Sequence, residues 1–331
     1  MAVVTVVMPA YNHEKFIGAA VESVLAQTMD DWELVVVDDG STDRTAEIVR
    51  SYKDPRLRLL QQTNCGAHHA LNRGIDEATA PWIAILNSDD RFQRDKFERH
   101  LEIHRSDPLL EASACRVRYI LESGIPASRY SYYCVQYKHL KSLSKTPLSL
   151  FASLLVANHL VTTSCLFVKR ETLLGMGGFI GLRFVHDWFM FLALAQRGKL
   201  LVLEEELTDY RRHSMNTIAG NDTAGLIEDN FVLEWYVSRV FESDRPLLDI
   251  SDLLGIMEKN RRLNFRLLFI FRLWRQVNSN DLVRCMQVFE DRHHWVLERC
   301  HEELRKTRVS RRIRRMRDRL KLFTGLVMDR M

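Results

Sequence analysis

Hydrophobic and polar positions follow two different rhythms along the first third of the chain. Nearly continuous apolar runs indicate strands at residues 3–8, 32–37, 57–60 and 82–86. Apolar side chains recur at helical spacing between and after these runs, at residues 15–27, 45–52, 67–78 and 93–104. Continuous hydrophobicity is typical of strands that are buried on both faces, as in a parallel sheet. The pattern therefore predicts an α/β domain whose mostly parallel, doubly wound sheet is flanked by helices.

The pattern is less regular after about Leu109. We expect further strands at residues 129–137, 161–168 and 199–203, and helices at residues 147–156 and 188–195. Residues beyond Asn221 carry long helical patterns with few strand candidates. The sequence thus divides into residues 1–108, 109–220 and 221–331, and the last of these is expected to be a mainly helical C-terminal region.

Composition is that of an ordinary globular protein. The 331 residues are 46% hydrophobic and 27% charged, with a formal net charge of +4, which excludes a disordered chain and gives no argument for nucleic acid. Six cysteines without CxxC or metal-ligand spacing indicate reduced thiols. The apolar start ends at Pro9 without a basic leader, and no window reaches the roughly 18 uncharged apolar residues of a membrane span. We therefore expect a cytoplasmic protein.

The end of the sequence is strongly basic. Between residues 311 and 321, seven Arg and Lys side chains surround a narrow apolar stripe that includes Ile313, Met316 and Leu320. This pattern fits an amphipathic helix on an anionic membrane surface, to which each cation contributes roughly 1 kcal/mol. The alternative is a solvated helix that packs against the rest of the protein or against a second subunit. No recognition motif supports nucleic acid.

Polar side chains follow three of the predicted strands, namely Tyr11-Asn12, Asp38-Asp39-Gly40-Ser41 and Asn87-Ser88-Asp89-Asp90. Ligands bind at the carboxyl ends of the strands in such sheets. A carboxylate such as Asp39 can accept from the edge of a base. Asp89 and Asp90 leave their strand in different directions, so one can meet a hydroxyl pair and the other a hard divalent cation. The alternative is that these residues form turns and helix caps.

The sequence lacks the nucleotide-binding loops of several enzyme classes. The turn after the first strand reads Pro9-Ala10-Tyr11-Asn12-His13-Glu14, without the GxGxxG of dinucleotide enzymes, and the sequence contains no GxxxxGK[ST] phosphate loop. A sugar nucleotidyltransferase would carry a Gly- and Arg-rich loop at this place. Dehydrogenase and P-loop ATPase chemistry are therefore disfavoured.

Four segments resemble family 2 glycosyltransferases of the GT-A fold in their order and spacing. They are VVMPAYNHEKFIGAAVESVLAQT, ELVVVDDGSTDRTAEIV, NCGAHHALNRGI and WIAILNSDD, and the likeness resumes more weakly at GMGGF, HDW and YRRHSMN. The resemblance implies a nucleoside-diphosphate sugar donor and a single displacement that inverts the anomeric carbon. It also implies that residues 1–108 form the nucleotide-sugar half of the GT-A domain and residues 109–220 the acceptor half.

The resemblance further implies roles for individual positions. Those for the donor are Pro9, Ala10, Tyr11 and Glu14 lining the nucleotide pocket, Asp39 reading the base, Asn64, Gly66 and Asn72 around the nucleotide, and Asp89 facing the ribose or sugar. Those for a metal, Mn²⁺ or Mg²⁺, are Asp90 as ligand and His213 as a metal-binding or positive group over the diphosphate. Weaker candidates for ligand contact are His68 and His69. The family often has an acid where this chain has Asn87.

Asp187 matches the catalytic base of the family, although His186 replaces the usual preceding Glu. An acceptor hydroxyl must lose its proton as it attacks, and a carboxylate at a helix start can accept that proton. The alternative for Asp187 is a helix N-cap.

The sequence thus predicts a metal-dependent, inverting glycosyltransferase of polysaccharide or glycan synthesis. We expect a UDP-sugar as donor, a glycan or lipid-linked acceptor, and the cytoplasmic face of a membrane as a possible location. Two alternatives stay open, because Asn87 and His186 depart from the family pattern. One is a sugar-nucleotide or glycan-binding module with little turnover, and the other is a sugar nucleotidyltransferase.

Overall fold

The computed structural model describes residues 2–127, 150–156, 158–214, 216, 228–229, 231–233 and 235–236. The chain divides into two compact units, residues 1–263 and 264–331, and every described residue lies in the first. The strand expected at residues 129–137, most of the C-terminal helical region and the basic tail lie outside the described residues. Among the described helices, none has the length and apolar character needed to cross a bilayer.

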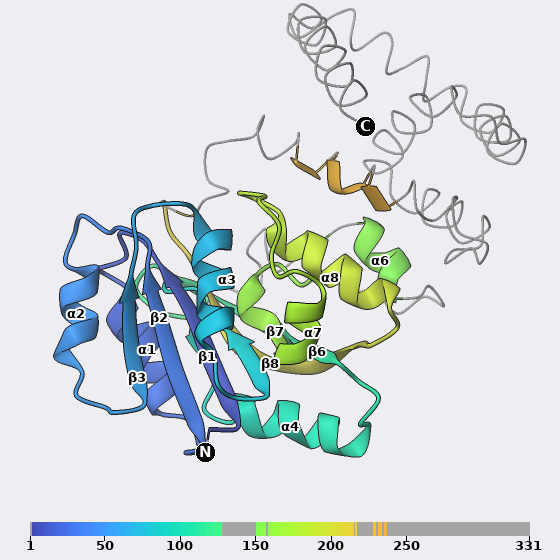
Figure 1. Ribbon diagram of the computed structural model, residues 1–331, viewed down its shortest axis with the longest axis horizontal. Coiled ribbons are helices and arrows are strands. Elements are labelled where there is room, and N and C mark those ends of the chain that lie inside the picture. The colour runs from blue at the N-terminus through green and yellow to red at the C-terminus, as the bar shows by residue number, and fades with distance from the viewer. Residues whose placement is uncertain are drawn as a thin grey trace, which may run out of the picture. The chain divides into compact units, whose positions relative to one another are not determined.

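The first half of the domain alternates strands and helices (Figure 1). Its elements are β1 (Val4–Ala10), α1 (Ile17–Leu25), β2 (Trp32–Asp38), α2 (Thr45–Ser51), β3 (Leu57–Gln61), α3 (Ala67–Glu77), β4 (Trp82–Ile85), β5 (Arg91–Phe92) and α4 (Lys96–Ser106). The elements of the second half are β6 (Ala112–Leu121), α6 (Leu150–Val156), the 3₁₀ turn η1 (Thr163–Cys165), β7 (Leu166–Lys169), α7 (Arg170–Gly175), α8 (His186–Gln196) and β8 (Leu200–Arg212).

One eight-stranded sheet runs through the described residues in the order β3-β2-β1-β4-β7-β6-β8-β5. The pairs β3–β2, β2–β1 and β1–β4 are parallel. Strand β7 is antiparallel to both β4 and β6, β8 is parallel to β6, and β5 is antiparallel to β8. The prediction of a mostly parallel α/β sheet flanked by helices is confirmed, and the antiparallel strands belong to the second half and to β5.

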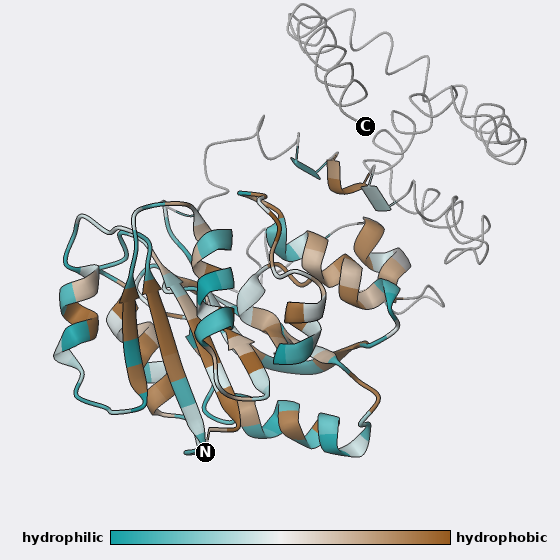
Figure 2. Cartoon of the chain, in the orientation of Figure 1, coloured by the Kyte–Doolittle hydropathy of each residue, from teal (hydrophilic) through white to brown (hydrophobic). Residues whose placement is uncertain are grey.

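Burial on both faces explains the continuous apolar runs. Alternate residues of β1 and β2, including Val6 and Val36, pack in the same core cluster as buried residues of α1 and α2. The residues between them, such as Val35 and Val37, pack against Ala70 of α3 on the opposite face. Figure 1 shows α3 on the near side of these strands, and Figure 2 shows the strands as an apolar band between the helices. The apolar residues on both faces of β1 and β2 are therefore packed against helices.

The second half differs from expectation at three strands. Strand β6 was not predicted, the strand expected at residues 161–168 begins only at Leu166 after η1, and β8 is longer than the expected 199–203. Charged residues obscured the apolar pattern of β6 and of the later part of β8. Arg116 and Arg118 of β6 form ion pairs with Glu204 and Asp209 of β8, and these residues break the apolar pattern. The charges of these two arginines are compensated by residues of β8, a strand far away in sequence.

Gly74 provides a stability prediction for the packing of α3 on β1. A Cβ atom there would lie 2.4 Å from Cγ1 of the buried Val7. We expect Gly74→Ala to lower the free energy of unfolding by about 1–3 kcal/mol through overpacking, although alanine favours helix by about 1 kcal/mol. Gly175→Ala at the end of α7 is the matched control, because no atom lies within 4 Å of its added Cβ. Urea unfolding measures both, and equal stability of the two variants would contradict this packing.

Candidate active site

Three strand ends meet at one edge of the sheet. Strands β2, β1 and β4 are neighbours, and Ala10 pairs with Asp38 in the register. The amide of Asp39 donates to the carbonyl of Ala10 at 2.8 Å. The polar segments that follow these strands therefore come together, as the parallel arrangement requires.

Asp39 organises the loop in front of α3. Its carboxylate is buried and accepts from the Gln62 side chain (2.8 Å) and from the amides of Cys65 (2.9 Å) and Gly66 (2.8 Å). Gly66 has φ +97°, a conformation that glycine adopts without strain. Because Oδ1 takes two of these bonds and Oδ2 only one, Oδ2 keeps an acceptor site for an incoming donor. Asp39 can thus shape the loop and bind a base edge.

The turn after β1 is fixed by the loop after β2. The Asn12 side chain accepts from the amide of Thr42 at 2.8 Å. The Glu14 carboxylate accepts from the amide of Arg44 at 3.1 Å and pairs with its guanidinium at 3.4 Å. Pro9 and Ala10 end β1, and Tyr11 is 45% exposed. Tyr11 is thus available to a ligand, whereas the Glu14 carboxylate is engaged within the protein.

Asn72 connects the two halves of the domain. Its amide donates to the carbonyl of Phe179 (2.9 Å) and accepts from the Phe179 amide (2.7 Å). Gly178 has φ +74°, and a Cβ there would lie 2.4 Å from the Asn72 oxygen. Asn72 therefore holds this turn through two hydrogen bonds. Asn64 lies exposed in the loop before α3.

Asp90 is fully buried among protein donors. Its carboxylate accepts from the hydroxyls of Ser164 (2.6 Å) and Thr162 (3.2 Å) and from the amide of Arg211 (3.0 Å). Burial, reinforced by the neighbouring charge of Asp89, raises the pKa of Asp90 well above its ordinary value. One carboxylate oxygen thus accepts from β8, and the other accepts from the segment before β7.

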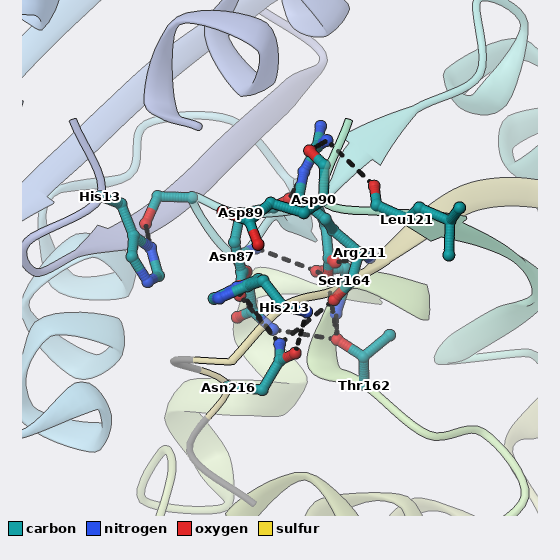
Figure 3. Close-up of polar contacts among 12 residues, drawn as sticks. His13, Asn87, Asp89, Asp90, Leu121, Thr162, Ser164, Arg211, His213 and Asn216 are labelled. Carbon is teal, nitrogen blue, oxygen red and sulfur yellow. Dashed lines mark hydrogen bonds and ion pairs between the residues drawn. The ribbon is translucent and has the colours of Figure 1, made fainter. Parts of the chain in front are cut away.

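Asp89 belongs to a different group of side chains (Figure 3). Its Oδ2 lies 3.0 Å from His213 Nε2 and 3.4 Å from Asn216 Nδ2. The ligand-type atoms of His13, Asp89 and His213 all lie within 4.8 Å of one another. Asp90, the sequence-based candidate for the acidic metal ligand, thus faces protein donors, whereas Asp89 faces the histidines, because consecutive side chains leave the chain in different directions.

The sequence analysis assigned no role to His13. The available signal was a ligand-type side chain in the turn after β1, at the same edge of the sheet as Asp89. His68 and His69 are outside this cluster. Their rings contact each other in a tilted arrangement with centroids 4.3 Å apart, and His68 borders Gly66 and Gly181.

Asn87 uses both ends of its amide, which accounts for an amide at this position. Its Nδ2 donates to Thr162 Oγ1 and its Oδ1 accepts from Thr163 Oγ1, both at 2.9 Å. Its backbone amide donates to Ser164 Oγ at 2.9 Å. An ionised carboxylate could not make the first of these bonds.

Asp187 lies in the first turn of α8 and is 8% exposed. It accepts from the amide of Trp188 (2.6 Å) and from Asn158 Nδ2 (3.1 Å). Burial raises the pKa of Asp187 to about 7, against the lowering effect of these hydrogen bonds. His186 beside it is partly buried, and this burial lowers its pKa to about 4, so it adds no positive charge at neutral pH. A carboxylate with these properties suits proton transfer near neutrality.

The segment 158–162 connects Asp187 with residues 87–90 at the end of β4, called the acidic strand end below. Asn158 Oδ1 accepts from the amide of Val161 at 3.2 Å, and Thr162 bonds both Asn87 and Asp90. Val161 has φ +70°, which is rare and costly for a β-branched residue. Such strain persists where surrounding contacts fix it, and here both sides of the segment are held by polar groups of the site.

Residues 5–167 match the family described as glycosyl transferase family 2. The chain belongs to this family. Among its relatives, the putative teichuronic acid biosynthesis glycosyltransferase TuaG of Bacillus subtilis is 39% identical over 102 residues, which cover 30% of this chain and 40% of the relative. The succinoglycan biosynthesis protein ExoO of Rhizobium meliloti is 45% identical over 100 residues, 30% of this chain and 29% of the relative. This family 2 chain thus spans less than half the length of these relatives.

Solved structures share the fold at low sequence identity. TarS of S. aureus, residues 1–349 in complex with UDP-GlcNAc, aligns with a TM-score of 0.58 at 17% identity over 87% of this chain and 80% of that one. The mannosyltransferase PcManGT of Pyrobaculum calidifontis, in complex with GDP-Man and Mn²⁺, aligns with a TM-score of 0.56 at 19% identity over 88% of this chain and 80% of that one. The family 2 domain therefore has the GT-A fold.

Proposed function

We propose that this protein is an inverting glycosyltransferase that transfers a sugar from a nucleoside-diphosphate sugar to an acceptor hydroxyl. The observation that carries the proposal is the buried Asp187 carboxylate, whose pKa is about 7 and whose partner Asn158 belongs to the segment that binds the acidic strand end. The relatives TuaG and ExoO, which are named for teichuronic acid and succinoglycan biosynthesis, support a role in polysaccharide synthesis. UDP-GlcNAc in TarS and GDP-Man in PcManGT support a nucleotide-sugar donor, and among these we propose a UDP-sugar.

The donor side of the site consists of Asp39, Tyr11 and the group around Asp89. Asp39 Oδ2 accepts from the base, and the exposed Tyr11 ring offers a stacking surface. Asp89 and His213, whose facing atoms lie 3.0 Å apart, fit a divalent cation because a carboxylate oxygen and an imidazole nitrogen are common ligands of Mn²⁺. When bound, such an ion balances the charge of the departing diphosphate.

Asp187 acts on the acceptor. Its carboxylate takes the hydroxyl proton while the acceptor oxygen bonds to the anomeric carbon and the bond to the diphosphate breaks. Because attack and departure occur on opposite faces, the anomeric configuration inverts. Trp188 and Asn158 hold the carboxylate from two sides, which orients it and favours its ionised form.

The raised pKa of Asp187 predicts the pH dependence of transfer. The base is protonated and inactive below its pKa, so kcat/KM is expected to rise with pH through about 7 and then level off. A hydrogen bond to a charged group contributes about 1.5–3 kcal/mol, and about 1.4 kcal/mol equals one pKa unit. Asn158→Leu is therefore expected to move the rising limb upward by about one pH unit. An unchanged limb in this variant would contradict the assignment of Asp187 as base.

Donor binding and turnover test the proposed function together. A thermal-shift panel of nucleoside diphosphates and their sugars, each with Mn²⁺ or Mg²⁺, is expected to give a selective stabilisation, since a ligand that binds only the folded state raises its stability. Release of the nucleoside diphosphate, with a glycan acceptor present, is then expected to follow. Binding without release would instead support a binding module. Release of pyrophosphate from a nucleoside triphosphate and a sugar phosphate would support a nucleotidyltransferase.

A further inference from the structure

Three side chains from distant segments converge at the acidic strand end. His13 follows β1, Asp89 follows β4 and His213 follows β8, and their ligand-type atoms lie within 4.8 Å of one another. The side chain of His213 is 1% exposed and that of Asp89 is 13% exposed. Two imidazoles and one carboxylate are thus held together in a largely buried place.

We propose that His13 is the third protein ligand of the cation and that the resulting site selects a transition-metal ion over Mg²⁺. The proposal rests on the proposed function, because it concerns the same cation. It adds a ligand that the sequence analysis did not identify, and it replaces the open choice between Mn²⁺ and Mg²⁺ with a preference that follows from ligand chemistry.

The spacing of the ligand atoms fits one ion. Two neighbouring ligands of an octahedral ion with bonds of about 2.1 Å lie about 3.0 Å apart. His213 Nε2 and Asp89 Oδ2 are 3.0 Å apart. Asn216 Nδ2 approaches these same two atoms at 3.3 and 3.4 Å, so a group with partial positive charge already lies beside the lone pairs that a cation would occupy.

His13 is oriented for this role by its neighbours. Its Nδ1 lies 2.7 Å from Ser88 Oγ, and its backbone amide donates to Thr45 Oγ1 at 2.8 Å. In the tautomer in which Nδ1 donates to the serine hydroxyl, Nε2 keeps a lone pair for the ion. Metal-bound histidines generally have such a partner on the other ring nitrogen, which fixes the ring and its tautomer.

The ligand types decide the preference among ions. Mg²⁺ prefers oxygen ligands, loses its water reluctantly and is usually held by one or two carboxylates with substrate phosphates. Imidazole nitrogens favour transition metals, whose affinity rises from Mn²⁺ toward Cu²⁺. Two nitrogens and one oxygen therefore bind Mn²⁺ or Co²⁺ more tightly than Mg²⁺, and positions remain for diphosphate oxygens and water.

Mn²⁺ binding to the full chain without donor tests this inference by electron paramagnetic resonance, which counts free Mn²⁺. We expect His13→Ala to weaken Mn²⁺ binding by about 10–100-fold or more, while His69→Ala, an exposed histidine outside the cluster, binds as wild type. His13→Gln serves as a second variant, and circular dichroism checks the folding of both. A 100-fold excess of Mg²⁺ over Mn²⁺ is expected to leave most of the Mn²⁺ bound.

Each contrary outcome has a distinct meaning. Wild-type Mn²⁺ affinity in both folded His13 variants, or ready displacement of Mn²⁺ by Mg²⁺, would overturn the inference. If His213→Ala nevertheless loses Mn²⁺ binding in the same experiment, only the role of His13 is refuted, and the cation site and the proposed function are retained. Absence of sugar transfer by wild-type protein across the donor panel, with Mn²⁺ binding intact and His13-dependent, would instead refute the proposed function and leave the metal site.

Discussion

Asp187→Asn is expected to lower kcat for sugar transfer by about 10²–10⁴-fold, the usual contribution of a general base. The amide cannot take the proton of the acceptor hydroxyl, and the carboxylate it replaces has a pKa of about 7 in the folded protein. Donor affinity is expected to stay near the wild-type value, because Asp187 is placed on the acceptor side. Release of nucleoside diphosphate in steady state, together with donor titration by calorimetry, measures the two quantities.

Stability separates a catalytic loss from a folding loss. A buried acid whose folded pKa lies above its unfolded value destabilises the fold as pH rises from about 4 to 7, and Asp187→Asn removes this penalty. The variant also loses one hydrogen bond, worth about 1 kcal/mol, because its amide nitrogen cannot accept from either the Trp188 amide or Asn158 Nδ2. We therefore expect little change in melting temperature. Asp95→Asn, an exposed acid before α4, is the matched control. Near-wild-type transfer by Asp187→Asn would exclude Asp187 as the base.

Asp89→Asn and Asp90→Asn are expected to differ in their effect on metal affinity. Asp89 faces His13 and His213, so its replacement is expected to weaken Mn²⁺ binding by at least about 10–100-fold and to lower kcat/KM with it. Asp90 has no such neighbour, and its carboxylate accepts three protein hydrogen bonds. Its replacement is expected to leave Mn²⁺ affinity close to wild type. One donor loses its acceptor, but the amide also removes the cost of burying an acid whose pKa is raised, so we expect little change in the free energy of unfolding.

Isothermal titration with Mn²⁺ and urea unfolding of both variants check this pair. The two carboxylates are adjacent in the chain, so each variant is the control for the other. Loss of Mn²⁺ binding in Asp90→Asn with retention in Asp89→Asn would restore the assignment of the metal to Asp90. Loss in both would show that the β4 end must stay intact for the site to form.

Much of the first half could be predicted because local pattern and tertiary environment agree there. Strands such as β1 and β2 are buried on both faces, so their apolar runs are unbroken. Strand β6 escaped prediction because Arg116 and Arg118 interrupt its pattern, and their ion-pair partners lie in β8. The positions of Asp39 and Asp187 followed from family motifs. Their environments, the amides around Asp39 and the buried setting of Asp187, did not.

The sequence by itself determined that acidic and polar side chains follow β1, β2 and β4, since strand ends and their residues are local properties. Only the tertiary structure decided which of them meet. It brought His13 and His213 to Asp89, buried Asp90 among donors from the segment before β7 and from β8, and raised the pKa of Asp187 through burial. The physical reason is that side-chain direction, desolvation and hydrogen-bond partners depend on segments far apart in the chain, which no local pattern of residues records.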